Sequence, residues 1–238
     1  MQKNFIFSDT ETTGLREKDF IQIIQSASIL TDESFERIDA QNIESRPLPW
    51  VVPQPGAYLV HKKISSLDSN ISHYQMMKDI YDTWEKWSDD KQSIFITYNG
   101  HQFDEELYRR QFYWNLLPPY ITNTNGNGRS DLYFLILLVS YLYPDFIKFN
   151  MNNYDLPILK LDQILPKIGI DVSDAHDALT DCEFMVHLIK FIYLEHSDLV
   201  EDFFLQATKA SFIDMLSTRN YFGYCLLYTS DAADDMQC

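Results

Sequence analysis

Two acidic residues separated by a single residue, Asp9 and Glu11, follow the apolar run at residues 4–7. Side chains at positions i and i+2 of a β-strand project from the same face, so these two carboxylates would lie close together. Two like charges that close repel each other unless a cation lies between them. The pair therefore predicts a metal site at the end of a buried strand. The alternative, two solvated acids on an exposed strand end, stays open for this motif taken alone.

A second acidic motif stands where a helix is predicted to begin. The stretch NGHQFDEEL gives Asn99-x-x-Phe103-Asp104, with Asp104 at or near the N-cap position. An Asp before a helix most often only accepts hydrogen bonds from the N–H groups of the first turn. Taken alone, this motif favours a plain helix cap over a catalytic acid.

The third motif, HDALTD, joins a histidine to an acid. His176 and Asp181 are five residues apart, about 140° around an ideal helix, so they converge only if His176 lies at or before the first turn. We expect Asp174 or Ser173 to cap that helix. Asp181 shares a helical stripe with four apolar residues: Ala178, Met185, Leu188 and Ile192. An ionised carboxylate on a buried stripe is costly without a partner, and no Lys or Arg lies within a turn on that face. A metal ion is the favoured partner, with backbone hydrogen bonds as the alternative.

The three motifs together predict a metal centre at one edge of a sheet. Its members come from a strand end, a helix start and a helix face: Asp9, Glu11, Asp104, Asp181 and His176. Several carboxylates without a thiolate favour hard cations such as Mg²⁺ or Mn²⁺. Two such ions can stabilise the attacking and leaving oxygens of a phosphodiester. His176 has a suitable pKa to accept the proton of the attacking water.

The elements that must position these residues alternate along the chain. Apolar periodicity and turn residues predict strands at 3–9, 20–30, 35–45 and 93–99. Helices are predicted near Gly56 and at 72–88, 104–115, 131–142, 158–170, 177–196 and 198–217. Strands interleaved with helices predict an α/β fold in which a mixed sheet is flanked by helices.

Length, composition and charge narrow the class of protein. The 238 residues fit one domain, and 45% hydrophobic content is typical of a globular chain. The longest apolar stretch, 132–142, is too short to span a bilayer, so no membrane partner is expected. Three cysteines without metal-ligand spacing predict a cytoplasmic setting. A net charge of −16 argues against a broad phosphate-binding surface, so any nucleic-acid function must rest on a local site.

The combined motifs resemble the DEDD-type 3′→5′ exonucleases of the histidine subclass. Asp-x-Glu, Asn-x-x-Phe-Asp and His-x-Ala-x-x-Asp occur in the order and with the separations of that family. Further stretches, among them PQPGAYLVHKKI, LPPY and GRSDL, are similar to bacterial exonuclease I, a single-strand DNA exodeoxyribonuclease. The resemblance covers residues 4 to about 217. It implies a ribonuclease-H-like α/β fold and release of mononucleotides from single-stranded DNA.

The resemblance also implies roles for individual residues. Asp9, Glu11 and Asp181 would hold two Mg²⁺ ions, with Mn²⁺ as a substitute, Asp104 would complete the set, and His176 would be the general base. Contacts with the DNA strand are implied at five positions: Glu11, Val60, Arg109, Tyr120 and Lys160. The chain departs from the family pattern at three positions, where Lys160 replaces an Arg, Lys63 replaces a Gly and Thr124 replaces an aromatic residue.

The domain limits follow from the same comparison. We expect an exonuclease domain at 1–217 and a short remnant at 218–238, within which 225–238 is a non-native tail because its small and acidic composition breaks with the preceding chain. We expect the later domains of exonuclease I, through which it would contact single-strand-binding protein, to be truncated, and we expect a monomer. Two other functions remain open: a related RNA-trimming or proofreading exonuclease, and a nucleic-acid-binding module with little activity because of truncation.

Overall fold

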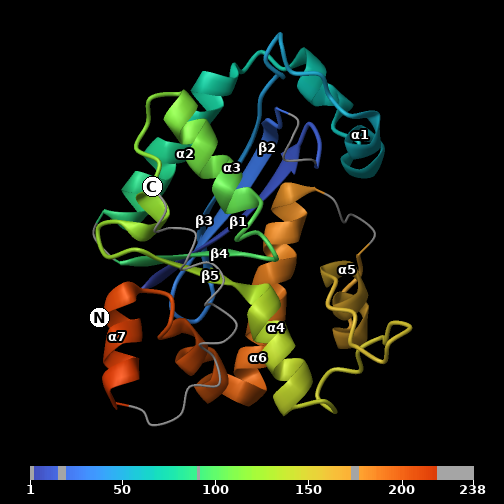
Figure 1. Cartoon of the computed structure of the whole chain (residues 1–238), viewed down its shortest axis with the longest axis vertical. Helices are drawn as coiled ribbons and strands as arrows, with labels where there is room; N and C mark the ends of the chain where they lie inside the picture. Colours follow the sequence, from blue (N-terminus) through green and yellow to red (C-terminus); the bar gives the residue numbers. More distant parts are fainter. Residues whose placement is uncertain (1–2, 16–19, 90–91, 173–176, 219–238) are drawn as a thin grey trace.

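A single five-stranded sheet forms the centre of the molecule (Figure 1). The computed structural model describes residues 3–15, 20–89, 92–172 and 177–218. The strand order is β3-β2-β1-β4-β5. The first three strands pair antiparallel, and β4 and β5 are added in parallel beyond β1. The bounds are β1 Asn4–Thr12, β2 Ile23–Thr31, β3 Arg37–Glu44, β4 Ser93–Thr97 and β5 Gly128–Asp131.

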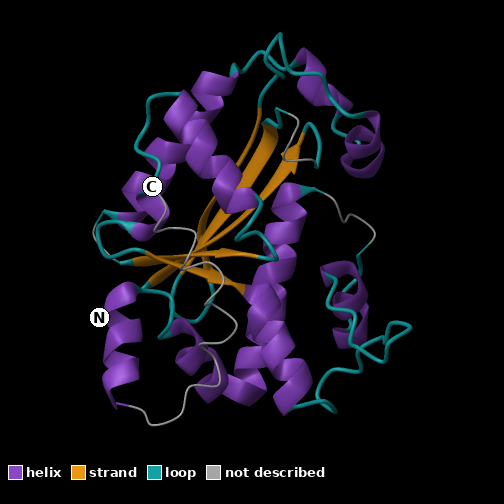
Figure 2. Cartoon of the chain, viewed as in Figure 1, coloured by secondary structure: helices purple, strands orange, loops and turns teal. Residues whose placement is uncertain are grey.

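Helices cover both faces of this sheet: in Figure 2 the helices, in purple, lie on either side of the strands, in orange. One face packs against α2 (His73–Ser88) and α3 (Asp104–Trp114), and the other against α4 (Leu132–Leu142) and α6 (Ala178–Phe204). The remaining helices are α1 Pro55–His61, α5 Leu161–Ile164 and α7 Lys209–Thr218, with 3-10 turns η1 Ile64–Asp68, η2 Ile121–Asn123 and η3 Leu165–Ile168. The layers are therefore helix, sheet, helix.

The alternation of β1 assigns its side chains to two separate apolar cores. Phe5 and Phe7 are buried in the core that contains α4 and α6, whereas Ile6 is buried in the core that contains α2 and α3. Because alternate residues share a face, Asp9 and Glu11 continue the row of Phe5 and Phe7. The strand therefore delivers both acids to the face that α6 covers.

The predicted fold class, an α/β mixed sheet flanked by helices, is confirmed, and several element bounds are corrected. Strand β5 was not among the predicted elements. The predicted helix at 158–170 is instead the single turn α5 followed by η3, because Pro166 lacks the N–H that a continuing helix needs. Helix α6 runs on to Phe204 with a kink at His196, whose dihedrals are non-helical, so the predicted break between 196 and 198 is confirmed. The helix predicted to continue to 217 instead ends at Phe204, and α7 begins at Lys209.

The cap of α6 is also corrected. Asp177 occupies the N-cap, and its carboxylate accepts hydrogen bonds from the N–H groups of Leu179 and Thr180. The expected cap, Asp174 or Ser173, is therefore wrong by at least three positions. The tail predicted at 225–238 lies outside the described residues. None of the described helices, α6 included, has an apolar stretch long enough to cross a membrane.

Candidate metal centre

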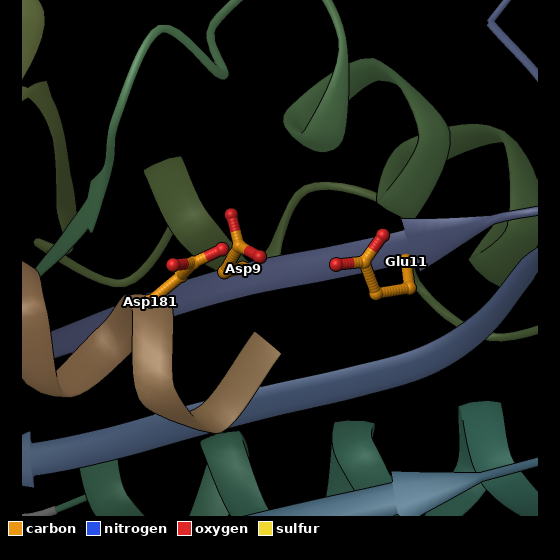
Figure 3. A group of neighbouring side chains, drawn as sticks. All are labelled: Asp9, Glu11 and Asp181. Atoms are coloured by element: carbon orange, nitrogen blue, oxygen red, sulfur yellow. The ribbon is translucent and has the colours of Figure 1, made fainter. Parts of the chain in front are cut away.

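Three carboxylates meet where β1 passes beneath the first turn of α6 (Figure 3). Asp9 and Glu11 come from the strand, and Asp181 projects from the helix. One oxygen from each lies within 4.8 Å of the other two, and all three residues are half-buried. Ligand atoms this close together can share one cation or two neighbouring cations.

The stripe predicted for α6 explains why Asp181 points at the strand. Ala178, Met185 and Leu188 are fully buried against the sheet, so the stripe that they form faces β1. Asp181 lies on the same stripe, one turn into the helix. The expectation of a carboxylate on the buried face is confirmed, and its neighbours in space are the other two acids.

Burial, and after it the repulsion between the carboxylates, dominates the electrostatics of the cluster. Burial raises the pKa of Asp9 well above its ordinary value, and the negative charges of Asp104, Asp181 and Glu11 raise it further. Burial, followed by the charge of Asp181, raises the pKa of Glu11 to about 8, although Lys63 acts in the opposite direction. Acids held together at such a penalty fit a site for a divalent cation, whose charge reverses each of these effects.

Asp104 is close to the three acids but outside the group that they form. It is the first residue of α3, and the N-cap itself is Phe103, so the expected capping role is wrong. Its carboxylate accepts a hydrogen bond from the hydroxyl of Thr10, whose side chain points away from Asp9 on β1. Burial raises the pKa of Asp104 to about 7, and this bond opposes the rise. The negative charge of Asp104 therefore helps to raise the pKa of Asp9, although its carboxylate is bonded to Thr10 and not grouped with the other three acids.

The conformation of the turn before α3 allows the carboxylate of Asp104 to lie close to the backbone at Gly100. Asn99 adopts a left-handed conformation with φ 55°. A Cβ on Gly100 would lie 2.7 Å from the Oδ2 atom of Asp104 and 2.7 Å from the Cβ atom of Thr97. Only glycine leaves room for the carboxylate here.

Asp131 is a contributor to this turn that the sequence motifs did not reveal. It is 1% exposed, and its carboxylate accepts hydrogen bonds from the backbone N–H of Asn99 at 2.6 Å, His101 at 3.2 Å and Tyr133 at 3.0 Å. It thus caps α4 and fixes the turn that leads to Asp104. The signal that could have found it is an Asp directly before the apolar run 132–139, which is a capping position.

A pocket of about 420 Å³ opens beside Asp9 and Asp181. Lys160 lies on its wall, and Tyr98 and Tyr133 supply aromatic surface. The hydroxyl of Tyr98, the residue after β4, donates to the backbone oxygen of Leu159 at 2.5 Å, which links the end of β4 to the segment that carries Lys160. The pocket therefore places a cation and two rings next to the carboxylates.

The other residues that were predicted to contact the DNA strand fall into two groups, a pair formed by Arg109 and Tyr120 and the single residue Val60. The guanidinium of Arg109 lies 5.8 Å from the ring centre of Tyr120, so these two form one unit. Arg109 also pairs with Glu106. Val60 is 52% exposed on α1. Contact of these residues with a nucleic acid stays a prediction, and His176 lies outside the described residues.

The sheet order and the helical layers define a ribonuclease-H-like domain, and the carboxylates at the junction of β1 with α6 form a group that could hold a metal ion. No family model matches the chain. It is 28% identical over 233 residues to exodeoxyribonuclease I of Buchnera aphidicola (subspecies Schizaphis graminum), an alignment that covers 92% of this chain and 47% of that protein.

Solved structures give the same result. Exonuclease I of Escherichia coli in complex with a dT13 oligonucleotide superposes with a TM-score of 0.80 at 26% identity, over 90% of this chain and 46% of the other. The zinc-bound form of the same enzyme with single-stranded DNA gives a TM-score of 0.76 at 26% identity, over 84% and 42%. The resemblance to bacterial exonuclease I is thus confirmed in sequence and in fold. The chain spans about half the length of the relatives that it matches.

Proposed function

We propose that this chain carries the catalytic domain of a metal-dependent exonuclease that removes mononucleotides from the 3′ end of single-stranded DNA. The observation that carries the proposal is the group of Asp9, Glu11 and Asp181, with oxygens within 4.8 Å of one another in a fold shared with exonuclease I. Acids so placed are unfavourable without a cation, and phosphodiester hydrolysis is the chemistry for which such centres are suited.

The cofactor that fits this set is a pair of Mg²⁺ ions, with Mn²⁺ as a substitute. Asp9, Glu11 and Asp181 would hold them, and Asp104 would complete the set from the side of Thr10. All donors are carboxylate oxygens, which suit hard cations, and the group found among the described residues contains no thiolate to favour a soft one. When bound, the ions would supply positive charge to the reacting phosphate.

The remaining residues bind and orient the substrate. Lys160, on the wall of the pocket beside Asp9, is placed for a phosphate oxygen, though without the two-pronged contact of an arginine. Arg109 and Tyr120 form a charged and aromatic unit of the kind on which single-stranded bases stack. Glu11 and Val60 would approach the terminal nucleotide, and His176 would accept a proton. The active form is a cytoplasmic monomer whose substrate is single-stranded DNA.

The test is a cleavage assay with a 5′-labelled oligonucleotide. With Mg²⁺ present, single-stranded DNA should shorten in one-nucleotide steps from the 3′ end, and EDTA should stop the reaction. The matched control is Asp181→Asn, which keeps the size of the side chain and removes its charge. Equal or faster trimming of a short RNA would favour the RNA-trimming alternative. Binding of DNA without cleavage at any metal concentration would favour the binding-module alternative.

A further inference from the structure

Lys63 is a partly buried cation held between two acids beside the metal centre. It precedes the 3-10 turn η1, and its ammonium group contacts the carboxylate of Asp177 and, at 3.5 Å, that of Glu44. Its side chain is 16% exposed. Burial lowers the pKa of Lys63, but the contacts with Asp177 and Glu44 outweigh burial and leave the pKa above its ordinary value. The group is therefore a fixed positive charge.

The sheet beneath Lys63 connects it to the metal centre. Glu11 on β1 pairs directly with Gln25 on β2, and Gln25 pairs with Glu44 on β3. Directly paired residues of antiparallel strands project from the same face, so these three side chains form one row across the sheet. Lys63 contacts one end of this row, and its charge is felt by Glu11 at the other end.

Asp177 connects Lys63 to the third carboxylate of the site. Its Oδ1 atom accepts the hydrogen bonds that cap α6, at 3.1 and 3.2 Å, while its Oδ2 atom accepts from Lys63 and, at 3.1 Å, from Gln25. One turn later, the backbone N–H of Asp181 donates to the backbone oxygen of Asp177 at 2.9 Å. The position of Asp177 thus determines where the first turn of α6 lies, and with it where Asp181 projects.

We propose that Lys63 is a positioning residue for the metal centre. Its ion pair with Asp177 holds the first turn of α6 against the row formed by Glu11, Gln25 and Glu44, so that Asp181 meets Asp9. The effect on nuclease activity rests on the proposed function, whereas the effect on metal affinity can be measured without it.

If Lys63 acted only through its positive charge, its removal would change the affinity for metal in the direction opposite to that expected for a positioning residue. Removing one positive charge beside three carboxylates strengthens their attraction for a divalent ion. Loosening the first turn of α6 weakens the affinity for metal, because one ligand is no longer held in place; loss of such an outer partner typically costs about 10-fold or more. The sign of the change in metal affinity therefore separates positioning from simple electrostatics.

The experiment compares Lys63→Met with the wild type by calorimetric titration with Mn²⁺. Methionine keeps most of the length of the side chain and removes its charge. We expect Mn²⁺ to bind roughly 10-fold more weakly. Lys63→Arg, which can still pair with Asp177, should restore most of the affinity. The matched control is Lys62→Met: Lys62 is the exposed neighbour, and its substitution should leave Mn²⁺ binding unchanged.

A second variant also removes the charge of Asp177, which Lys63→Met leaves without its ion-pair partner. In Lys63→Met combined with Asp177→Asn, the asparagine can still cap α6 but carries no charge. This variant should fold, as judged by circular dichroism, and still bind Mn²⁺ more weakly than the wild type. Wild-type or tighter Mn²⁺ binding by the folded double variant, or by Lys63→Met alone, would overturn the proposal.

Activity measurements separate this proposal from the proposed function. With single-stranded DNA, Lys63→Met should lower kcat at limiting Mg²⁺ and regain most of it at saturating Mg²⁺, with little change in KM. A wild-type protein that binds Mn²⁺ but cleaves no nucleic acid would contradict the proposed function and leave the role of Lys63 intact. A cleaving wild type with unchanged Mn²⁺ affinity in Lys63→Met would contradict only the role of Lys63.

Discussion

Replacing Glu11 by glutamine should make the metal-free protein more stable and nearly abolish its activity. Burial and the charge of Asp181 raise the pKa of Glu11 from 4.5 to about 8 in the folded protein. An acid whose pKa is raised on folding costs stability when it is ionised. Glutamine has almost the same shape and no charge, so the substitution removes that cost and also removes a metal ligand.

The magnitude follows from the pKa shift. At pH 7 the folded carboxyl group is largely protonated and the unfolded one is ionised, so the penalty is about 1.4 kcal/mol for each of the roughly 2.5 pH units between 4.5 and 7, about 3.5 kcal/mol at most. Glu11 is only half-buried, and solvent screens part of this energy. We therefore expect a gain of about 1–2 kcal/mol, which for a chain of this size raises Tm by about 2–8 °C.

The pH dependence has a definite sign. The folded protein binds more protons at Glu11 than the unfolded protein does between pH 4.5 and about 8. The penalty is thus absent below pH 4.5 and grows as the pH rises to 8. The difference in Tm between Glu11→Gln and the wild type should shrink as the pH is lowered from 8 to 5.

The assay is thermal unfolding in EDTA and again in Mg²⁺. In EDTA the variant should unfold at the higher temperature, and Mg²⁺ should stabilise the wild type more than the variant. The control is Glu183→Gln on α6, where a partly exposed acid pairs with Arg37 and little change is expected. A variant that melts at or below the wild-type temperature in EDTA at pH 8 would refute the reasoning.

Four further predictions concern other parts of the chain. His176→Ala should keep the fold and Mn²⁺ binding but lower the rate of oligonucleotide cleavage roughly 10²- to 10⁴-fold; a near wild-type rate would exclude a general base there. Gly100→Ala should destabilise the protein by about 1–3 kcal/mol in urea unfolding and reduce cleavage, because the added methyl group displaces Asp104. His73 is buried with no hydrogen-bond partner among the described residues, and burial lowers its pKa from 6.5 to about 4. Between these pH values the unfolded protein binds a proton that the folded protein does not, so the free energy of unfolding falls as the pH is lowered from 6.5 to 4. His73→Met should reduce this loss of stability in thermal melts at acid pH. Deletion of 225–238 should leave Tm unchanged; a large decrease would show that the segment is part of the fold.

Elements with a strong local pattern were predictable from the sequence. Strand β1 alternates between two cores, and α6 carries an apolar stripe that identifies its buried face. Both patterns also predict which way Asp9, Glu11 and Asp181 point, because an acid at the same periodic positions as buried residues projects from the same face of its strand or helix. Strand β5 could not be found this way: its four residues, GRSD, have no apolar alternation and are held by pairing with β4.

The role of Asp104 shows where local reasoning stops. Its position before an apolar helical run is typical of a cap, yet the side chain bonds to Thr10, which is 94 residues away. Only the parallel pairing of β1 with β4 brings the two segments together. The role of Asp131 in this turn was missed for the same reason, because two of the three hydrogen bonds that it accepts come from N–H groups about 30 residues earlier in the chain.

The site is built so that the fold carries the electrostatic cost and a cation removes it. Asp9 extends a strand whose preceding side chains, Phe5 and Phe7, are buried, and Asp181 lies on a helix stripe between buried Ala178 and buried Met185. Neither element can move its acid away without exposing apolar surface, at about 25 cal/mol for each Å². Burial, with repulsion added to it, therefore raises the pKa of Asp9, and the carboxylates stay close together. A divalent ion meets ligands that already lie within 4.8 Å of one another, so little ordering is required when it binds.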